Sequence, residues 1–372
     1  HPLTRARLER LHVGVAEHRL RLLDVLGRAG ITPLAGGRAE PSAVPGEDSI
    51  TTYYHQIHRD WAWEAEGNQE NTAAFAEIAA LLDGAAPLGD TLVIGAGACR
   101  LPSDVHDAFG GALTVAIDIN PLPMLVARRV LAGETVQLLE LPVTPKDVDH
   151  VVVDRALRAH GARRPGFVQL FADGFDPPFE PGSFDTVITP WFIDQVPADM
   201  TTFFPIVHRM LRAGGRWIDT GPLLYHPQHT ARVHRYAHDE VLALVEQGGF
   251  RIDRHRRSAL PYMQSPACSQ GRIEAVVSFV ATRLEAANPT TVASADVPPA
   301  WLADARLAIP RFEGLAEYVA PHPLFAAVVA AIDGQRSTSD IAALLVARNG
   351  LPSGAALGGV QSCLAEIWRA TR

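Results

Sequence analysis

The chain has 372 residues, of which 47% are hydrophobic and 20% charged, and its formal net charge is −8. This length suffices for one large domain and a smaller one. The acidic balance argues against nucleic acid as the main partner, because phosphate contacts need a basic face. The three cysteines lie far apart without Cys-x-x-Cys spacing, which argues against a disulfide framework and a structural zinc site. Without a signal peptide or an apolar run of about 18 residues, we expect a cytoplasmic protein with no membrane partner.

Short apolar runs alternate with amphipathic stretches along most of the chain. Helical spacing of leucines predicts a helix over residues 1–30, and two more helices are expected within 49–83. Strands are predicted at 91–94, 113–117, 167–171, 185–189, 216–220, 250–255 and 273–282, with helices at 105–109, 124–131, 200–211 and 238–247. Residues 132–166 are predicted to be an irregular, charged and unusually long insertion before the third strand of the sheet. The alternation predicts an α/β, Rossmann-like fold with a mostly parallel seven-stranded sheet and helices on both faces.

The same pass along the chain predicts four regions. They are an N-terminal helical lid (1–85), a cofactor-binding domain (86–283), a linker rich in alanine and proline (284–300) and a small helical domain (301–372). Residues 323–349 read as helix, turn, helix, with Ser337 or Thr338 as a cap of the second helix. This pattern resembles small winged-helix or PqqD-like modules. Docking or homodimerisation is favoured for this domain, and recognition of a peptide is the alternative.

A glycine-rich turn, Val93-Ile-Gly-Ala-Gly-Ala-Cys-Arg100, follows the first predicted strand. Gly95 and Gly97 allow the backbone to approach a ligand closely, and the next helix begins with free N–H groups. Asp118 follows the second strand about 21 positions after Gly97, where an acid can accept two hydrogen bonds from ribose hydroxyls. These features fit any dinucleotide or nucleoside cofactor, and the turn by itself fits an ordinary structural loop equally well.

Three further features favour S-adenosylmethionine over a dinucleotide. Arg100 stands where a dinucleotide-binding loop has its third glycine, which serves packing around a pyrophosphate. Asp173, followed by Gly174 and Phe175, lies just past the third strand, where an acid can bind the adenine amino group. Leu211–Ile218 is a helix end, a Gly-Gly turn and a strand, which resembles the post-helical turn of class I methyltransferases. The sequence therefore predicts a class I methyltransferase with S-adenosylmethionine as its cofactor.

The acceptor side is predicted at the carboxyl end of the sheet, where open α/β sheets bind ligands. Trp191-Phe-Ile-Asp194 follows the fourth strand, and Gly221-Pro-Leu-Leu-Tyr-His226 follows the fifth. Asp194 and His226 are thus expected to face one pocket. On spacing alone, Asp194 is equally well explained as a helix cap.

Four pieces of this sequence resemble the carnosine N-methyltransferase (N2227-like) family. They are Gln56-Ile-His-Arg-Asp-Trp61, the glycine loop, Trp191–Asp194 and Gly221–His226, so the resemblance covers roughly residues 50–283 and leaves out the last 70 or so. The chain departs from the family at Asp118, where the family has Glu, and at Trp191, where the family has Phe. The second change implies a different wall of the acceptor pocket.

The resemblance implies a role for each matching residue. Arg59, within the predicted lid, would pair with the methionyl carboxylate of the cofactor. The implied cofactor-binding residues are Gln56, Arg59, Gly95, Ala96, Gly97, Asp118, Asp173, Gly174 and Phe175. The implied substrate-binding residues are Trp191, Phe192, Asp194, His226 and Tyr262.

The implied reaction is methyl transfer to an imidazole nitrogen of histidine, a histidine derivative or a histidine-containing dipeptide or peptide. The alternative is a methyltransferase for another small molecule, or for a peptide recruited by the C-terminal domain. The predicted catalytic residues are Asp194, which would hold the ring N–H, and His226, which would do the same or take the proton afterwards. No metal is required, and we expect His58 and His208 to lie at the surface.

Overall fold

The structure is a computed structural model that describes residues 1–31, 54–84, 87–159, 161, 165–196, 199–225, 230–285, 299–312, 314–315, 318, 323–349 and 353–370. The chain divides into two compact units. The first unit comprises residues 1–195, 201–224 and 236–289, and the second comprises residues 196–200, 225–235 and 290–372. Within the described ranges, no helix is both long and apolar enough to cross a membrane.

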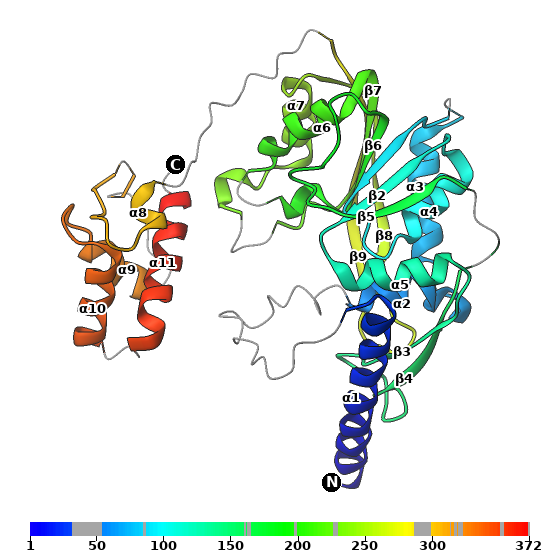
Figure 1. Cartoon of the computed structure of the whole chain (residues 1–372), viewed down its shortest axis with the longest axis horizontal. Coiled ribbons are helices and arrows are strands. Elements are labelled where there is room, and N and C mark those ends of the chain that lie inside the picture. Colours follow the sequence, from blue (N-terminus) through cyan, green and yellow to red (C-terminus); the bar gives the residue numbers. More distant parts are fainter. Residues whose placement is uncertain are drawn as a thin grey trace. The chain divides into compact units, whose positions relative to one another are not determined.

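The first unit is built on a seven-stranded sheet (Figure 1). Its strands are β1 (Thr91–Ile94), β2 (Thr114–Asp118), β5 (Phe167–Phe171), β6 (Phe184–Pro190), β7 (Leu211–Gly221), β8 (Phe250–Tyr262) and β9 (Arg272–Arg283). They are ordered β5-β2-β1-β6-β7-β9-β8; β9 pairs antiparallel with β7 and β8, and the other pairs in this sheet are parallel. Strand order reverses beside β1, which creates the switch point where such sheets bind ligands. The predicted Rossmann-like α/β fold with a mostly parallel seven-stranded sheet is confirmed.

Helices cover both faces of this sheet (Figure 1). One face carries α3 (Glu70–Leu82) and α4 (Arg100–Phe109), and the other carries α6 (Phe204–Met210) and α7 (His238–Gln247); α5 (Pro121–Leu131) follows β2. Side chains alternate along a strand, so adjacent residues of β7 serve different faces. Ile218 packs in the cluster of α3 and α4, whereas the Trp217 ring centroid lies 5.5 Å from that of Phe204 in α6. Both side chains are fully buried, so each face of the sheet packs closely against its layer of helices.

Residues 132–166 are not irregular, contrary to the prediction. They contain an antiparallel hairpin of β3 (Val136–Glu140) and β4 (Val153–Leu157). The long helix α1 (Pro2–Arg28) packs against it: a Cβ on Gly14 would lie 2.4 Å from a methyl carbon of Val152. The hairpin also contacts α2 (Tyr54–Trp61), which is followed by the 3₁₀ helix η1 (Trp63–Glu66). α1, α2 and the hairpin together form a cap at one end of the sheet (Figure 1).

A buried ion pair explains why the hairpin was missed. Glu140 is fully buried, and the Arg155 side chain is 4% exposed. Arg155 Nε donates to Glu140 Oε2 over 2.7 Å, and Trp63 Nε1 donates to the same oxygen over 3.0 Å. Ser265 Oγ donates to the other carboxylate oxygen, and Arg155 also contacts Glu66. Charged residues at core positions hid the apolar alternation that would have predicted the strands.

Two histidines expected at the surface are buried instead. His58, in α2, is 0% exposed, and His208, in α6, is 7% exposed. α2 lies between the hairpin and α5, so its inner side chains have no access to solvent. Burial lowers the pKa of His58 well below its usual value, which keeps the ring neutral.

The edge strands of the sheet, β5 and β8, differ in their side chains. β8 carries four arginines, and three of them pair with acids of neighbouring helices. Arg256 pairs with Glu77 of α3, Arg254 with Asp83 at the C-cap of α3, and Arg257 with Asp239 of α7. Pairing with β9 extends β8 to Tyr262, seven residues beyond the predicted end. β5 carries no charged residue, and three of its apolar side chains are exposed: Val168, Leu170 and Phe171.

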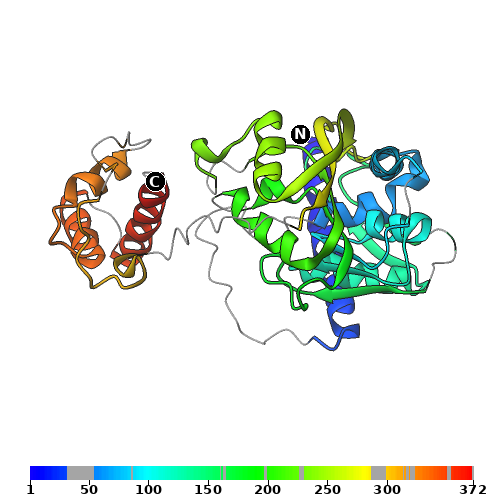
Figure 2. The same cartoon turned by 90° about the horizontal axis from the view of Figure 1, so that it is seen from above.

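The second unit contains four α-helices and one short 3₁₀ helix, Arg232–His234, that lie wholly in its described residues (Figure 2). The α-helices are α8 (Ala300–Ala303), α9 (Pro323–Ala331), α10 (Thr338–Asn349) and α11 (Ser353–Ala370). Its own apolar core includes the fully buried Val328, Ile341 and Leu364. Ser337 caps α10 as predicted: its hydroxyl accepts from Asp340 N, while its own N–H donates to the Asp340 carboxylate.

Candidate active site

The glycine loop joins β1 to α4 in the conformation that its sequence predicts. Gly95 and Gly97 have φ values of 78° and 54°, in the left-handed region that favours glycine. A Cβ on Gly95 would lie 2.6 Å from the Phe192 ring, so the loop and this ring are in close contact. The buried Ala96 lies between the two glycines.

Asp118 ends β2 directly beside the loop. One carboxylate oxygen accepts from Gly97 N and the other from Asn120 N, each over 2.7 Å. Burial raises the pKa of Asp118, and these backbone N–H groups oppose that rise. The carboxylate is thereby fixed at the strand end, with lone pairs left for further donors.

Exposed apolar side chains lie close in sequence to Asp118 and Asp173, the two predicted cofactor-binding acids. Ile119 is 74% exposed, directly after Asp118, and Phe175 is 36% exposed. Asp173 Oδ1 accepts from Phe175 N over 2.8 Å, which orients this turn. At Gly174, a Cβ would lie 2.5 Å from Ile94, so the chain passes close to the end of β1. Apolar surface beside two carboxylates fits a nucleoside, which has flat rings, hydroxyls and an amino group.

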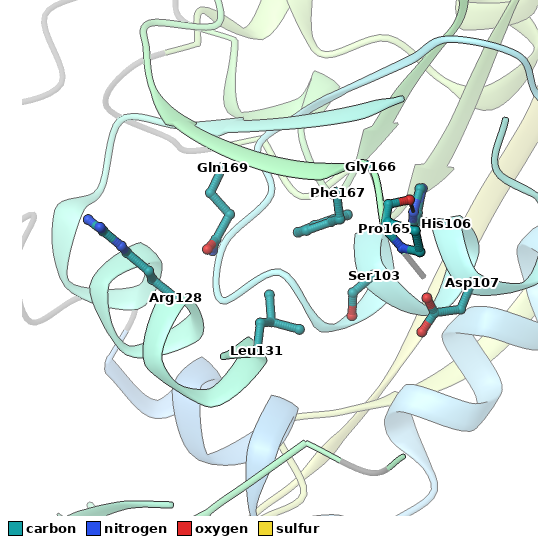
Figure 3. A pocket seen from close by; sticks show the side chains of 9 residues that line it. All are labelled: Ser103, His106, Asp107, Arg128, Leu131, Pro165, Gly166, Phe167 and Gln169. Carbon is teal, nitrogen blue, oxygen red and sulfur yellow. Dashed lines mark hydrogen bonds between the residues drawn. The ribbon is translucent and has the colours of Figure 1, made fainter. Parts of the chain in front are cut away.

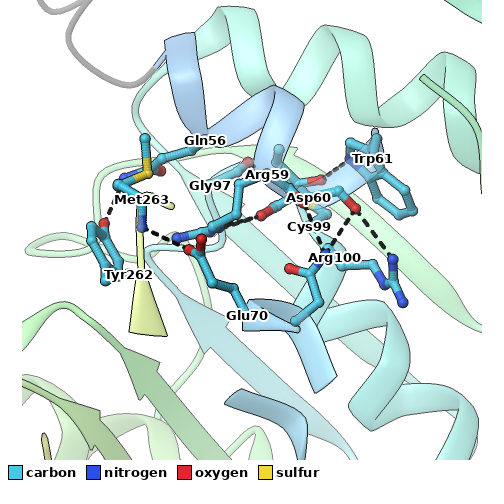
Figure 4. Close-up of polar contacts among 12 residues, drawn as sticks. Gln56, Arg59, Asp60, Trp61, Glu70, Gly97, Cys99, Arg100, Tyr262 and Met263 are labelled. Carbon is cyan, nitrogen blue, oxygen red and sulfur yellow. Dashed lines mark hydrogen bonds and ion pairs between the residues drawn. The ribbon is translucent and has the colours of Figure 1, made fainter. Parts of the chain in front are cut away.

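The lid helix α2 lies over the loop (Figure 4). Trp61 Nε1 donates to Ala98 O over 2.8 Å, and Gln56 Oε1 lies 3.4 Å from the position of a Cβ on Gly97. Gln56 Nε2 also donates to the hydroxyl of Tyr262 over 3.2 Å. The structure thus brings together Gln56, the glycine loop and Tyr262, which are far apart in the sequence.

Arg59, in α2, and Arg100, at the start of α4, both form ion pairs (Figure 4). Arg59 binds Asp60 Oδ1 at 2.8 Å, and its guanidinium carbon lies 5.4 Å from the centre of the Tyr262 ring. Arg100 pairs with Glu64 and with Asp104, each at 2.6 Å, and donates to Asp60 O. Arg100 therefore ties the start of α4 to the lid, a role that its place in the loop did not reveal.

Asp194 lies beyond the carboxyl end of β6, in a short 3₁₀ helix (Ile193–Gln195). It is 3% exposed, and its Oδ2 accepts from Leu224 N over 3.1 Å. This bond joins the segments after β6 and β7, as expected for one edge. Burial raises the pKa of Asp194 to about 6, and the charge of Glu274 adds to the rise. Phe192, two residues before this acid, has its ring against the glycine loop at Gly95.

A second buried carboxyl, Asp219, lies behind Asp194 on β7. It is 1% exposed, and Thr189 donates to it over 2.5 Å. Trp217 Nε1 in turn donates to the Thr189 hydroxyl over 2.9 Å. Burial raises the pKa of Asp219 well above its usual value, and the charge of Asp194 acts in the same direction. Sequence reasoning missed this residue, because nothing in the pattern Trp-Ile-Asp-Thr distinguishes it from an ordinary strand residue.

Trp191 and Tyr262 form an aromatic wall at the carboxyl edge of the sheet. Their ring centroids are 6.0 Å apart at an interplanar angle of 23°, which is a stacked arrangement. The last predicted residue, His226, lies outside the described residues.

A cavity of about 270 Å³ lies elsewhere in this unit (Figure 3). It is lined by residues of α4, α5 and the start of β5, among them His106, Arg128, Phe167 and Gln169. His106 bonds to Thr114 Oγ1 over 2.8 Å and to Pro165 O over 3.2 Å. None of the predicted site residues lines this cavity, so it is separate from the candidate active site.

Comparison with known proteins bears on the acceptor side of the site. The sequence of residues 162–283 matches the profile of the carnosine N-methyltransferase family. The matched segment makes up about a third of the chain. It contains Trp191–Asp194, Gly221–His226 and Tyr262, whereas the glycine loop precedes it. A 57-residue stretch is 39% identical to carnosine N-methyltransferase of Dictyostelium discoideum, and it makes up 15% of this chain and 12% of that protein.

Solved structures resemble the chain more remotely. One is described as converting a disulfide bond into a thioacetal group during echinomycin biosynthesis. Its sequence is 14% identical to this chain, and the TM-score is 0.41, with 65% of this chain and 94% of that chain covered. Another is an S-adenosylmethionine-dependent methyltransferase from Mesorhizobium loti, 15% identical, with a TM-score of 0.37 over 56% of this chain and 98% of that chain. Scores this low carry no argument about function.

Proposed function

We propose that this chain is an S-adenosylmethionine-dependent N-methyltransferase that acts on an imidazole nitrogen. The acceptor is histidine, a histidine derivative or a histidine-containing dipeptide or peptide. The observation that carries the proposal is Asp194, a buried carboxylate at the carboxyl edge of the sheet, two residues after Phe192, whose ring lies against the glycine loop. The match of residues 162–283 to the carnosine N-methyltransferase profile supports the same acceptor.

The residues around the glycine loop fit the proposed cofactor. Gly95, Gly97 and Asp118 would hold its ribose side, and Asp173 its adenine, beside the exposed Ile119. Arg59 would exchange its bond with Asp60 for the methionyl carboxylate, or extend it. When bound, the cofactor supplies an electrophilic methyl group on a sulfonium, whose leaving group departs neutral. The protein's task is therefore to align the acceptor and to exclude water.

Asp194 would perform the alignment. A neutral imidazole has one N–H and one nitrogen with a free lone pair. An ionised Asp194 that accepts from the N–H fixes the tautomer and presents the other nitrogen to the methyl group. Its charge then stabilises the imidazolium that forms. Phe192 and Trp191 supply flat apolar surface for the ring, and His226 would serve as a second partner for the proton.

The proposed role of Asp194 predicts an acid limb in the pH profile. Because the ionised carboxylate is required and its pKa is about 6, kcat/KM should be constant above that pH and fall about tenfold per pH unit below it. The acceptor for this experiment needs a ring pKa well below 6, so that its own protonation does not contribute. Asp194→Asn should lack the limb. A limb unchanged in that variant would assign it to another group.

The proposed position of the cofactor beside the glycine loop predicts the effect of replacing Gly95 by alanine. Gly95→Ala should weaken cofactor binding by about tenfold or more, because its Cβ would overlap the Phe192 ring and its φ is 78°. Calorimetric titration with S-adenosylmethionine measures this. Gly133→Ala is the matched control, since Gly133 has a φ of 89° but nothing within 4 Å of an added Cβ. Equal losses in both variants would contradict a ligand-binding role for Gly95.

The function itself is tested with isotopically labelled S-adenosylmethionine and a panel of histidine, carnosine and related imidazoles. Mass spectrometry should locate one added methyl group on a ring nitrogen of at least one acceptor. If no imidazole is methylated although the cofactor binds, the acceptor class is wrong. If the cofactor does not bind by calorimetry, the methyltransferase proposal itself fails.

A further inference from the structure

Trp191 has a backbone conformation that a bulky residue rarely adopts. Its φ is 51°, in the left-handed region, where a large side chain requires support from its surroundings. Its N–H donates to Thr220 O over 2.7 Å, which ties it to the end of β7. At Gly221 a Cβ would lie 3.0 Å from the Trp191 Cα, so a glycine is needed there for this approach.

The indole of Trp191 is held by a buried carboxylate. Its Nε1 donates to Glu274 Oε2 over 2.8 Å, and the Glu274 side chain is 2% exposed. Arg272 Nε donates to the other oxygen of Glu274 over 2.7 Å. The guanidinium carbon of Arg272 lies 4.6 Å from the centre of the Tyr262 ring, and Tyr262 stacks on Trp191. The four side chains therefore form a closed ring of contacts at the tip of β8 and β9.

The chain contains the same combination of residue types a second time. Trp63 Nε1 donates to Glu140 Oε2, and Arg155 Nε donates to that carboxylate as well. There, the arrangement joins η1 to the β3–β4 hairpin, and Trp63 has an ordinary helical backbone. Since one such trio already serves packing, the strained backbone of Trp191 calls for a separate explanation.

We propose that Glu274 is a positioning residue that holds the Trp191 indole as the specificity-determining wall of the acceptor site. This inference rests on the proposed imidazole N-methyltransferase function. Trp191 is three residues from Asp194 and adjacent to Phe192, so its orientation sets the space beside the acceptor ring. The indole limits the acceptor to a single five-membered ring, and Glu274 prevents the indole from rotating away.

Variants of Trp191 and Glu274 distinguish a role in positioning the indole from a role in the stability of the fold alone. Trp191→Phe and Glu274→Ala should each raise the KM for the best imidazole about tenfold, the effect of roughly one lost hydrogen bond. The double variant should be no worse than either single one, because both changes remove the same bond. Glu274→Gln keeps an acceptor for the indole N–H, so its KM should stay within about twofold of the wild-type value. Affinity for S-adenosylmethionine should be unchanged in all of them.

Ring preference is the readout that would not move if Glu274 served only packing. Trp191→Phe and Glu274→Ala should each raise kcat/KM for benzimidazole relative to imidazole about tenfold, because a smaller or released wall admits the larger ring. Trp63→Phe is the matched control: it also removes one indole–carboxylate bond, and it should leave the ring preference unchanged.

The outcomes distinguish this inference from the function on which it rests. If the wild-type protein methylates an imidazole but Trp191→Phe and Glu274→Ala keep its acceptor KM and ring preference, the inference is overturned and the function stands. The same holds if Trp63→Phe changes the ring preference equally. If the wild-type protein methylates no imidazole, the proposed function fails and the acceptor wall fails with it.

Discussion

Replacing Asp194 by alanine is expected to lower kcat/KM for an imidazole acceptor by about 10²–10⁴-fold, the range for a group that handles a proton in the transition state. The variant loses both the alignment of the ring N–H and the charge that stabilises the imidazolium. Cofactor affinity should persist, because the glycine loop, Asp118 and Asp173 do not bond to Asp194. Steady-state kinetics and calorimetric titration of the same preparation give the two values.

Asp194→Asn is the control for shape. Asparagine still accepts from Leu224 N through its amide oxygen, so the segments after β6 and β7 should stay together. It lacks the charge, and we expect activity close to that of the alanine variant. If Asp194→Ala abolished cofactor binding, Asp194 would have to be reassigned to the cofactor side. If Asp194→Asn kept wild-type activity, a neutral acceptor would suffice and the charge would have no role.

Glu140→Ala is expected to lower the free energy of unfolding by about 3–5 kcal/mol, the cost of removing one partner of a buried ion pair. The change leaves Arg155, whose side chain is 4% exposed, without its buried carboxylate, and it leaves the Trp63 N–H without an acceptor. It also removes the hydrogen bond that joins the hairpin to η1. Chemical denaturation of the cofactor-free chain measures the loss.

Glu134→Ala is the matched control, because Glu134 pairs with Arg129 while its own side chain is 46% exposed. Exposed pairs contribute about 0–1 kcal/mol, so this variant should unfold almost like the wild type. Glu140→Gln should lie between the two, since an amide oxygen can still accept from Trp63. A loss below about 1 kcal/mol in Glu140→Ala would mean that the buried ion pair contributes little to stability.

The sequence was sufficient for the sheet because apolar periodicity and glycine turns are local signals. β1 and β5 begin and end where the pattern predicts, and Asp118 lies where its spacing from Gly97 places it. The post-helical turn at Gly214 and Gly215 lies within β7, whose pairing with β6 begins already at Leu211. Boundaries of this kind depend on the neighbouring strand, which is distant in the sequence.

The residues that sequence reasoning missed act through tertiary contacts. Glu140 and Arg155 resemble solvent-exposed charges until their strands pair, and only then does each neutralise the other. Glu274 stands in a strand with alternating residues and gives no sign that it accepts from Trp191, 83 positions earlier. The αL backbone of Trp191 has no local signal either, because only Gly221 on the next strand makes room for it.

The two edges of the sheet give the first unit a directional behaviour in concentrated solution. The β8 edge has arginines that are paired with acids of the same molecule, so another chain's strand would meet charges on approach. The β5 edge carries exposed valine, leucine and phenylalanine without a charge in the strand. The β5 edge therefore lacks the charged side chains that hinder edge-to-edge pairing at β8.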